Sequence, residues 1–155
     1  MNIQSIIKQL KKFENQIRKS KSPILFQHTE ETLLEKKHIL SFIDNQKNVL
    51  YMRLPKGEKT YIGFEQTIKH EINSKEEFIN LKNVTYKLKN NKINNDVLLF
   101  GVTSFNMDQK NSSPWNNIPR GYFFIPSILF TYTNKESFLT ISLSLKNDFS
   151  LEEIE

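Results

Sequence analysis

The amino-acid sequence predicts an α+β fold, a largely antiparallel β-sheet or sandwich with flanking helices. Three spacings typical of helix N-caps alternate along the chain with at least five β-rich runs. Short connections join neighbouring β-rich runs, as antiparallel strands allow and parallel strands do not. We therefore expect neither an all-helical bundle nor a parallel sheet with regular βαβ crossovers.

The composition fits one soluble domain that spans residues 1–155 and has a sizeable core. No cysteine is present, which excludes a disulfide framework and a thiolate zinc site. No apolar stretch reaches the length of a signal peptide or a membrane span, so the sequence predicts a cytoplasmic protein. The net charge of +5 arises from scattered lysines, a bias that genome composition explains as well as an anionic partner does.

An amphipathic helix is predicted at the N-terminus. Its apolar residues recur at three- and four-residue steps, and they are Ile3, Ile6, Ile7, Leu10, Phe13 and Ile17. A strand is predicted over Ile24–Thr29, directly after Pro23. Thr32 and Glu35 then have the spacing of a capping box, which predicts that a second helix begins there. The apolar face of this helix would consist of Leu33, Leu34, Ile39, Leu40 and Ile43.

Two antiparallel strands are predicted in the middle of the chain. They cover Val49–Leu54 and Thr60–Ile72, and a turn that contains a proline and a glycine joins them. A second capping-box spacing, from Ser74 to Glu77, predicts a short helix. This helix gives way to a loop rich in lysine and asparagine over Lys87–Asp96.

A buried strand and a long loop are predicted next. Val97–Phe100 is a continuous apolar run too short for a helix, and Gly101 ends it because glycine tolerates backbone angles that other residues avoid. The following stretch, Thr103–Ile118, is rich in Asn, Ser, Asp and Pro, as loops are. Its single Trp115 is more typical of a packing anchor than of a ligand-stacking residue.

Two β-rich runs, Tyr122–Tyr132 and Phe138–Leu145, are separated by a connection of hairpin length. The second run alternates strictly between apolar and hydroxyl residues, so one face should pack on a core while the other meets water or a thin polar cover. Pro126 donates no ladder hydrogen bond, which predicts an edge, a bulge or the beginning of the strand.

The last residues carry a third capping-box spacing, from Ser150 to Glu153. The sequence ends at Glu155, so a helix would begin and not be completed. An acidic, frayed tail is the alternative, because isolated capping spacings are common. We expect an N-terminal fragment of a larger protein, produced by design, by proteolysis or by truncation of the gene.

A set of residues in the second half of the chain has a recognisable order, namely Phe100-Gly101, Phe105-Asn106, Trp115, Pro119, Phe124 and Pro126. This set resembles the N-terminal region of isochorismate synthases, which belong to the chorismate-utilising enzymes together with anthranilate and aminodeoxychorismate synthases. The family pattern reads approximately FGGxxFD, then Trp, then a proline before an FxxP strand and a hairpin. Val102 replaces the second glycine here, and Asn106 replaces the aspartate.

The resemblance extends upstream and covers roughly Val49–Leu145. Leu54-Pro55 and the run Tyr61–Phe64 resemble the strand pair that leads into a GxG-like turn in the family, with Glu65 in place of the second glycine. The resemblance implies that the parent enzyme is an isochorismate synthase, which converts chorismate to isochorismate for menaquinone or siderophore biosynthesis.

The resemblance also implies a mechanism for the full-length enzyme. A lysine base activates water to attack C2 of chorismate, a glutamic acid helps the C4 hydroxyl leave, and carboxylates hold the Mg2+ that binds the substrate carboxylate. In the family these residues belong to the C-terminal part, and no position here matches their motifs. We therefore assign this chain no catalytic, cofactor-binding or metal-ligating residue, and expect Mg2+ only in the parent. The chain should be a scaffold whose partner is the catalytic C-terminal part.

The residues that could carry chemistry have simpler explanations. His28, His38 and His70 are far apart in sequence and match no metal-ligand spacing. The pairs Glu76-Glu77 and Glu152-Glu153 fall at predicted helix starts, where the helix dipole favours carboxylates. No GxSxG, Walker or GxGxxG motif occurs.

Three other interpretations stay open. The parent could be another chorismate-utilising enzyme, such as an anthranilate, aminodeoxychorismate or salicylate synthase. A basic nucleic-acid-binding module is a more distant alternative, suggested by Arg120 and the run Tyr122–Phe124. The basic helix within Met1–Ser20 could also lie on a membrane. We expect neither nucleic acid nor membrane as a partner, and we expect that a fragment whose hairpin at Tyr122–Leu145 lacks its cover either self-associates or binds the C-terminal part.

Overall fold

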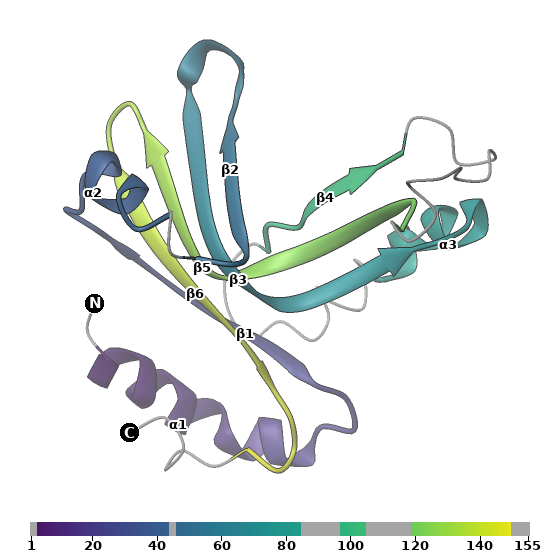
Figure 1. The fold of residues 1–155 in the computed structure, drawn as a ribbon. Helices are drawn as coiled ribbons and strands as arrows, with labels where there is room; N and C mark the ends of the chain where they lie inside the picture. Colours follow the sequence, from purple (N-terminus) through teal and green to yellow (C-terminus); the bar gives the residue numbers. More distant parts are fainter. Residues whose placement is uncertain (1–2, 44–45, 85–96, 105–118, 150–155) are drawn as a thin grey trace.

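The computed structural model describes residues 3–43, 46–84, 97–104 and 119–149. Its elements, in chain order, are α1 (Ile3–Lys19), β1 (Ile24–Glu31), α2 (Lys36–Leu40), β2 (Val49–Arg53), the 3-10 turn η2 (Pro55–Gly57), β3 (Lys59–Ile72), α3 (Lys75–Ile79), β4 (Phe100–Thr103), β5 (Gly121–Thr133) and β6 (Ser137–Leu145). Within these residues the strands form one six-stranded sheet, and the strand pairs are antiparallel. The predicted α+β fold with a largely antiparallel sheet is confirmed (Figure 1).

The sheet is organised around β5. The strand order is β1-β6-β5-β3-β2, and β4 pairs with β5 outside this path. The later half of β5 pairs with β6, its earlier half pairs with β4, and β3 accompanies it along the other side. At the place where β5 changes partner, β3 and β5 turn together, from the part of the sheet that contains β2 toward the part that contains β4 (Figure 1).

A β-bulge marks the place where these strands turn. The register between β3 and β5 shifts between Gln66 and Ile68, and Pro126 pairs with Gln66 at this point. Glu65 has a φ of 54°, a left-handed conformation that a residue with a side chain rarely adopts. An extra residue on one strand bends that strand and increases its twist. The sequence left an edge, a bulge or the beginning of a strand open for Pro126, and the structure shows the bulge.

Hydrogen bonds from Thr67 hold the bulge in place. Its hydroxyl donates to the carbonyl oxygen of Ser142 at 2.7 Å and is joined to the hydroxyl of Ser127 at 2.9 Å. Ser142 is 1% exposed, and the side-chain amide of Gln27 donates to its hydroxyl at 2.9 Å. The predicted polar side of β6 therefore includes a fully buried serine, because side chains of β1 and β3 cover it.

Two helices pack on one face of the sheet. The amphipathic helix predicted at the N-terminus is confirmed as α1, and it buries Ile6, Leu10 and Ile17 against strands β1 and β6. The cluster around α2 contains Ile39 from the helix and Leu139 from β6. Leu139 lies an even number of residues from Leu145 of the α1 cluster, so both helices cover the same face. Figure 1 shows α1 and α2 toward opposite ends of β1 and β6.

The start of α2 differs from the prediction. The helix begins at Lys36 and its N-cap residue, Glu35, makes no side-chain capping bond. The N–H of Thr32 donates to the carbonyl oxygen of Ser137, so Thr32 extends the pairing of β1 with β6. Leu33 is completely exposed and therefore lies on no helical apolar face. The predicted capping box was wrong because a ladder bond to β6 keeps the chain extended at the position where a helix was expected.

The predicted strand at Val97–Phe100 is also displaced. Strand β4 begins at Phe100 and runs to Thr103, so Gly101 lies inside the strand and does not end it. The position of β4 is set by its pairing with β5, which places Phe100 opposite Phe124. The sequence predicts that the whole apolar run is buried, but in the structure Leu98 is 41% exposed.

Other sequence predictions agree with the structure. The strand pair at 49–72 and the hairpin at 121–145 are present as β2–β3 and β5–β6. Ser74 caps α3, because its hydroxyl accepts a hydrogen bond from the N–H of Glu77 at 3.1 Å. The predicted loops at 87–96 and around Trp115, and the third capping spacing at 150–153, lie outside the described residues, apart from the first residues of the long loop, which belong to β4 and the segment after it.

Candidate functional site

The three histidines lie on separate elements. His28 is on β1, His38 is exposed on α2, and His70 is on β3 opposite Phe123. Within the described parts of the chain, no group of three or more His, Cys, Asp or Glu side chains is placed to hold a metal ion. The structure therefore does not bring the histidines together.

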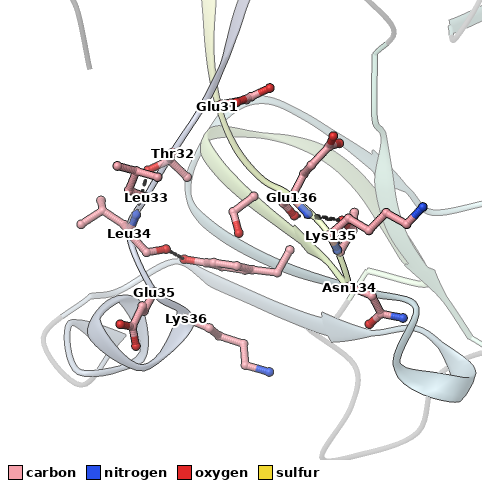
Figure 2. A pocket seen from close by; sticks show the side chains of 12 residues that line it. Glu31, Thr32, Leu33, Leu34, Glu35, Lys36, Asn134, Lys135 and Glu136 are labelled. Atoms are coloured by element: carbon pink, nitrogen blue, oxygen red, sulfur yellow. Dashed lines mark hydrogen bonds between the residues drawn. The ribbon is translucent and has the colours of Figure 1, made fainter.

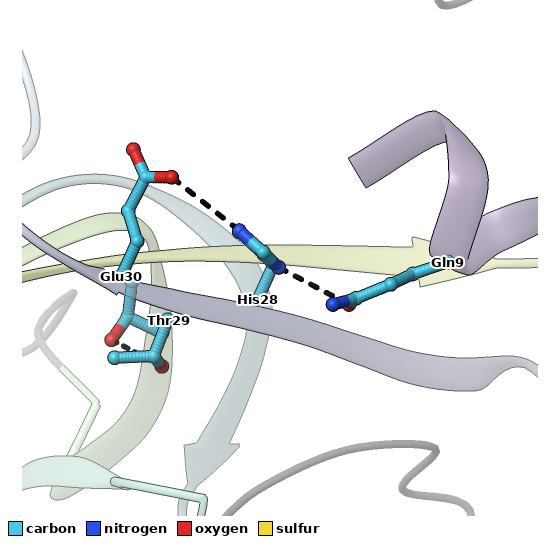
Figure 3. A network of polar contacts seen from close by, with 5 residues as sticks. Gln9, His28, Thr29 and Glu30 are labelled. Atoms are coloured by element: carbon cyan, nitrogen blue, oxygen red, sulfur yellow. Dashed lines mark hydrogen bonds and ion pairs between the residues drawn. The ribbon is translucent and has the colours of Figure 1, made fainter. Parts of the chain in front are cut away.

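His28 ties α1 to the sheet (Figure 3). The residue is 6% exposed, and its Nδ1 lies 3.1 Å from Oε1 of Gln9 on α1. On its other side, Nε2 lies 3.6 Å from Oε2 of Glu30, too far for a hydrogen bond. Beside it on β1, Thr29 shares a hydrogen bond with the hydroxyl of Thr140 on β6. These contacts give His28 a role in packing α1 against β1.

The adjacent glutamates Glu76 and Glu77 lie in the first turn of α3, as the sequence predicts. The carboxylate of Glu77 accepts a hydrogen bond from the N–H of Asn73 at 2.7 Å, and its own N–H is bound by Ser74. The two glutamates thus stabilise the N-terminus of α3. The second pair, at 152–153, lies outside the described residues.

The aromatic run of β5 is divided between the two faces of the sheet. Phe124 is 9% exposed, and its ring packs against Phe100 and Tyr122. Strand alternation places Phe123 on the opposite face, over Gly101. The ring of Tyr122 already carries the ammonium group of Lys69 at 5.4 Å. Tyr122 and Phe124 therefore pack with Phe100 on one face of the sheet, and Phe123 packs on the other face.

Phe105-Asn106 and Trp115 lie outside the described residues, and the described residues that carry the family resemblance lie close together at the bend of the sheet. Tyr61 and Phe100 pack edge to face with ring centroids 5.4 Å apart, and Phe124 and Leu129 complete a buried cluster with them. A Cβ at Gly63 would lie 2.9 Å from Cγ of Pro126, so the glycine leaves room for the proline ring. Residues of the upstream motif, Tyr61 and Gly63, thus pack directly against residues of the downstream motif.

An apolar groove lies beside α2 on the helix-covered face. It has a volume of about 340 Å3 and is lined by Ile39, Phe42, Gln46, Phe64, Glu65, Ile128 and Phe130. Phe42 is 61% exposed and Ile128 is 37% exposed. Sequence reasoning missed this groove, because Phe42 follows α2 and Ile128 stands inside a strand that reads as core.

A more polar pocket of about 480 Å3 opens at the end of the β5–β6 hairpin (Figure 2). It is lined by Glu31, Thr32, Leu33, Leu34, Glu35, Lys36, Tyr132, Thr133, Asn134, Lys135, Glu136 and Ser137. The hydroxyl of Tyr132 donates to the carbonyl oxygen of Leu34 at 3.0 Å. Burial raises the pKa of the Tyr132 phenol above its ordinary value. The mixed charges of the lining favour no single class of ligand.

Comparison with known families decides the assignment. The model of the chorismate binding enzyme family matches residues 3–155, nearly the whole chain. The chain belongs to the chorismate binding enzyme family. This membership confirms the resemblance stated above to the N-terminal region of chorismate-utilising enzymes.

A solved structure has a similar fold. The menaquinone-specific isochorismate synthase MenF from Escherichia coli superposes with a TM-score of 0.56 at 12% sequence identity. The superposition covers 97% of this chain and 31% of the MenF chain, so this chain spans about a third of that enzyme. No match was found among the curated proteins. None of the described helices is long and apolar enough to cross a membrane.

Proposed function

We propose that this chorismate binding enzyme chain is the N-terminal scaffold part of an isochorismate synthase, which converts chorismate to isochorismate for menaquinone or siderophore biosynthesis. The observation that carries the proposal is the likeness to MenF, which extends over 97% of this chain and 31% of that enzyme. A part of this kind would supply the sheet on which the rest of the enzyme folds. The catalytic C-terminal part is its proposed partner.

We assign the chemistry to that partner. The polar groups of this chain that first suggest catalysis have structural contacts, since His28 meets Gln9 and the Glu77 carboxylate caps α3. The Mg2+ that the resemblance implies would bind carboxylates. Among the described residues, no three or more His, Cys, Asp or Glu side chains lie together so that they could hold a metal ion. We therefore derive no catalytic step from this chain. In our proposal, Mg2+ binds only to the full-length enzyme.

The proposal is tested by activity with and without the partner. The probe is the polypeptide of the same organism that carries the family's lysine base and paired glutamates. The purified chain should not convert chorismate with Mg2+ in excess, and adding that polypeptide should produce isochorismate. Turnover by the chain alone, abolished by a point change within it, would overturn the proposal.

The identity of the product separates the alternative within the family. An isochorismate synthase forms isochorismate without a nitrogen donor, whereas anthranilate and aminodeoxychorismate synthases form aminated products only when ammonia is supplied. A salicylate synthase would go on to salicylate. Chromatography of the reconstituted reaction, with and without ammonia, therefore distinguishes these enzymes.

A further inference from the structure

The positive charge of the chain is concentrated at its N-terminus. Residues 1–21 contain six of the 22 lysines and arginines but only one of the 17 acidic residues. They therefore account for the whole net charge of +5, and residues 22–155 are neutral overall. A general bias toward lysine would give the rest of the chain a positive charge as well, so the charge of this segment calls for an explanation of its own.

The structure arranges four of these side chains in a row on the outer side of α1. The helix buries Ile6, Leu10 and Ile17 against the sheet, which lies on only one side of it (Figure 1). At 3.6 residues per turn, four exposed lysines fall on the opposite side of the helix. We call this row, about 16 Å long at about 1.5 Å per residue, the lysine stripe. It consists of Lys8, Lys11, Lys12 and Lys19.

The helix does not neutralise the lysine stripe. Glu14 is the only acidic residue of α1, and its Oε1 lies 2.7 Å from a guanidinium nitrogen of Arg18. The one carboxylate of the helix is therefore already paired with a cation outside the stripe. Among the residues that the structure describes, no ion pair involves a lysine of the stripe. The stripe is thus an exposed row of positive charge.

This arrangement fits a flat anionic surface. A lysine ammonium group is a strongly hydrated point charge on a flexible stem, whereas arginine presents the rigid fork that recognises a single phosphate group. The four lysines of the stripe lie on one side of one helix, so they can approach a plane together. Clusters of four to eight basic residues on an amphipathic helix are typical of proteins that bind anionic lipids.

Two other modes of binding fit the helix less well. Proteins that bind single-stranded nucleic acid combine basic residues with aromatic side chains on which the bases stack. The only aromatic residue of α1 is Phe13, which packs against the buried cluster, so the lysine stripe has no aromatic neighbour on the helix. Insertion into a bilayer needs a free apolar face, and the apolar face of α1 is buried against the sheet.

We propose that the lysine stripe of α1 binds the surface of an anionic membrane by electrostatic attraction, without insertion of the helix. This proposal does not depend on the enzyme activity proposed above. It replaces the sequence-based expectation that the protein has no membrane partner, because the structure directs the apolar residues of α1 inward and its lysines outward. Since the rest of the chain is neutral overall, the attraction orients the molecule with α1 toward the lipid.

Binding is tested by sedimentation of the full chain with vesicles. The probe is a vesicle of phosphatidylcholine that contains about a third phosphatidylglycerol, and vesicles of phosphatidylcholine alone are the control. At about 0.1 M salt the chain should sediment with the anionic vesicles and stay in solution with the neutral ones. It should be released at about 1 M salt, because salt screens the attraction between exposed charges.

Two matched pairs of substitutions distinguish the lysine stripe from the net charge. An exposed lysine strengthens binding to such a surface by about fivefold, so Lys8→Gln combined with Lys12→Gln should weaken binding by about 10- to 30-fold. The control combines Lys59→Gln with Lys135→Gln, which remove the same charge from exposed residues at the start of β3 and in the β5–β6 turn. The control should weaken binding by about threefold at most.

A second pair keeps the proposal testable if the first does not fold. Lys11→Gln combined with Lys19→Gln removes the other two charges of the stripe and should also weaken binding by about 10- to 30-fold. Circular dichroism and thermal unfolding establish that each variant is folded.

Three results would overturn the proposal. The first is a chain that stays in solution with anionic vesicles at about 0.1 M salt. The second is an equal loss of binding in the stripe variants and in the control, which would assign the attraction to the net charge alone. The third is single-stranded RNA that releases the chain from the vesicles at an equal concentration of phosphate, which would assign the lysine stripe to nucleic acid.

Discussion

Phe123 lies directly over Gly101 across the pairing of β4 with β5. A Cβ at position 101 would lie 2.0 Å from Cδ1 of Phe123, well inside van der Waals contact. The two residues are partners in the strand register, so the ring covers the backbone where the glycine has no side chain. The glycine that the sequence suggests as a strand end is therefore required for ring packing within the strand.

Gly101→Ala should destabilise the protein, because the new methyl group forces the Phe123 ring out of its position. We expect a loss of about 1–3 kcal/mol in the free energy of unfolding, the usual range for overpacking. The neighbouring change Val102→Ala affects a residue that is 54% exposed and should cost about 0.5 kcal/mol or less. Chemical denaturation of both variants measures the difference. Equal losses would show that the ring does not depend on the glycine.

Thr67→Val should weaken the bulge that turns the sheet. The substitution removes the hydroxyl that is bound to the Ser142 carbonyl oxygen and to the Ser127 hydroxyl. Each of these two groups then loses a hydrogen-bond partner. We expect a loss of about 1–3 kcal/mol in the free energy of unfolding. The control Thr29→Val removes an exposed hydroxyl pair with Thr140 and should cost less. If the control costs as much as Thr67→Val, the bulge does not depend on this hydroxyl.

Two residues that look alike in sequence should differ in thermal unfolding. Ser74→Ala removes a true helix cap and should cost about 1 kcal/mol. Thr32→Ala removes only a bond from the N–H of Leu34 at 3.2 Å in an exposed turn, and should cost about 0.5 kcal/mol or less. A larger loss for Thr32→Ala would mean that its capping box forms in solution.

The stability of the protein should fall at alkaline pH partly through Tyr132. Burial raises the pKa of its phenol above 10.0, so the folded protein holds this proton more tightly than the unfolded chain does. The resulting stabilisation is present below the unfolded pKa and is lost as pH rises through the folded pKa. Tyr132→Phe removes this component together with the bond to Leu34.

The stability gap between the original protein and Tyr132→Phe should therefore be about 0.5–1.5 kcal/mol at neutral pH and should shrink above about pH 10. Denaturation at a series of pH values measures the gap. Absorbance titration of the phenols, compared between the two proteins, gives the pKa directly. A gap that stays constant through the alkaline range would contradict the assignment.

Local spacing in the sequence determined the helices and strands whose signals lie within a few residues of each other. The period of Ile6, Leu10 and Ile17 defines α1 because a helix brings such residues to one face. The Ser74 cap was predictable because a capping hydroxyl acts on adjacent backbone groups, and the missing N–H of Pro126 limited it to an edge, a bulge or the beginning of a strand. The family motifs were visible for the same reason, as short runs of fixed order.

Only the tertiary structure decided which of these local signals prevail and how the resulting helices and strands pack together. Thr32 stays extended because β6 offers it a ladder bond, and Gly101 lies within a strand because Phe123 needs its space. The groove depends on where α2 ends relative to Ile128, which no local pattern encodes. The physical reason is that pairing and packing join residues far apart in the chain, and their free energy exceeds the small preferences that neighbouring residues impose.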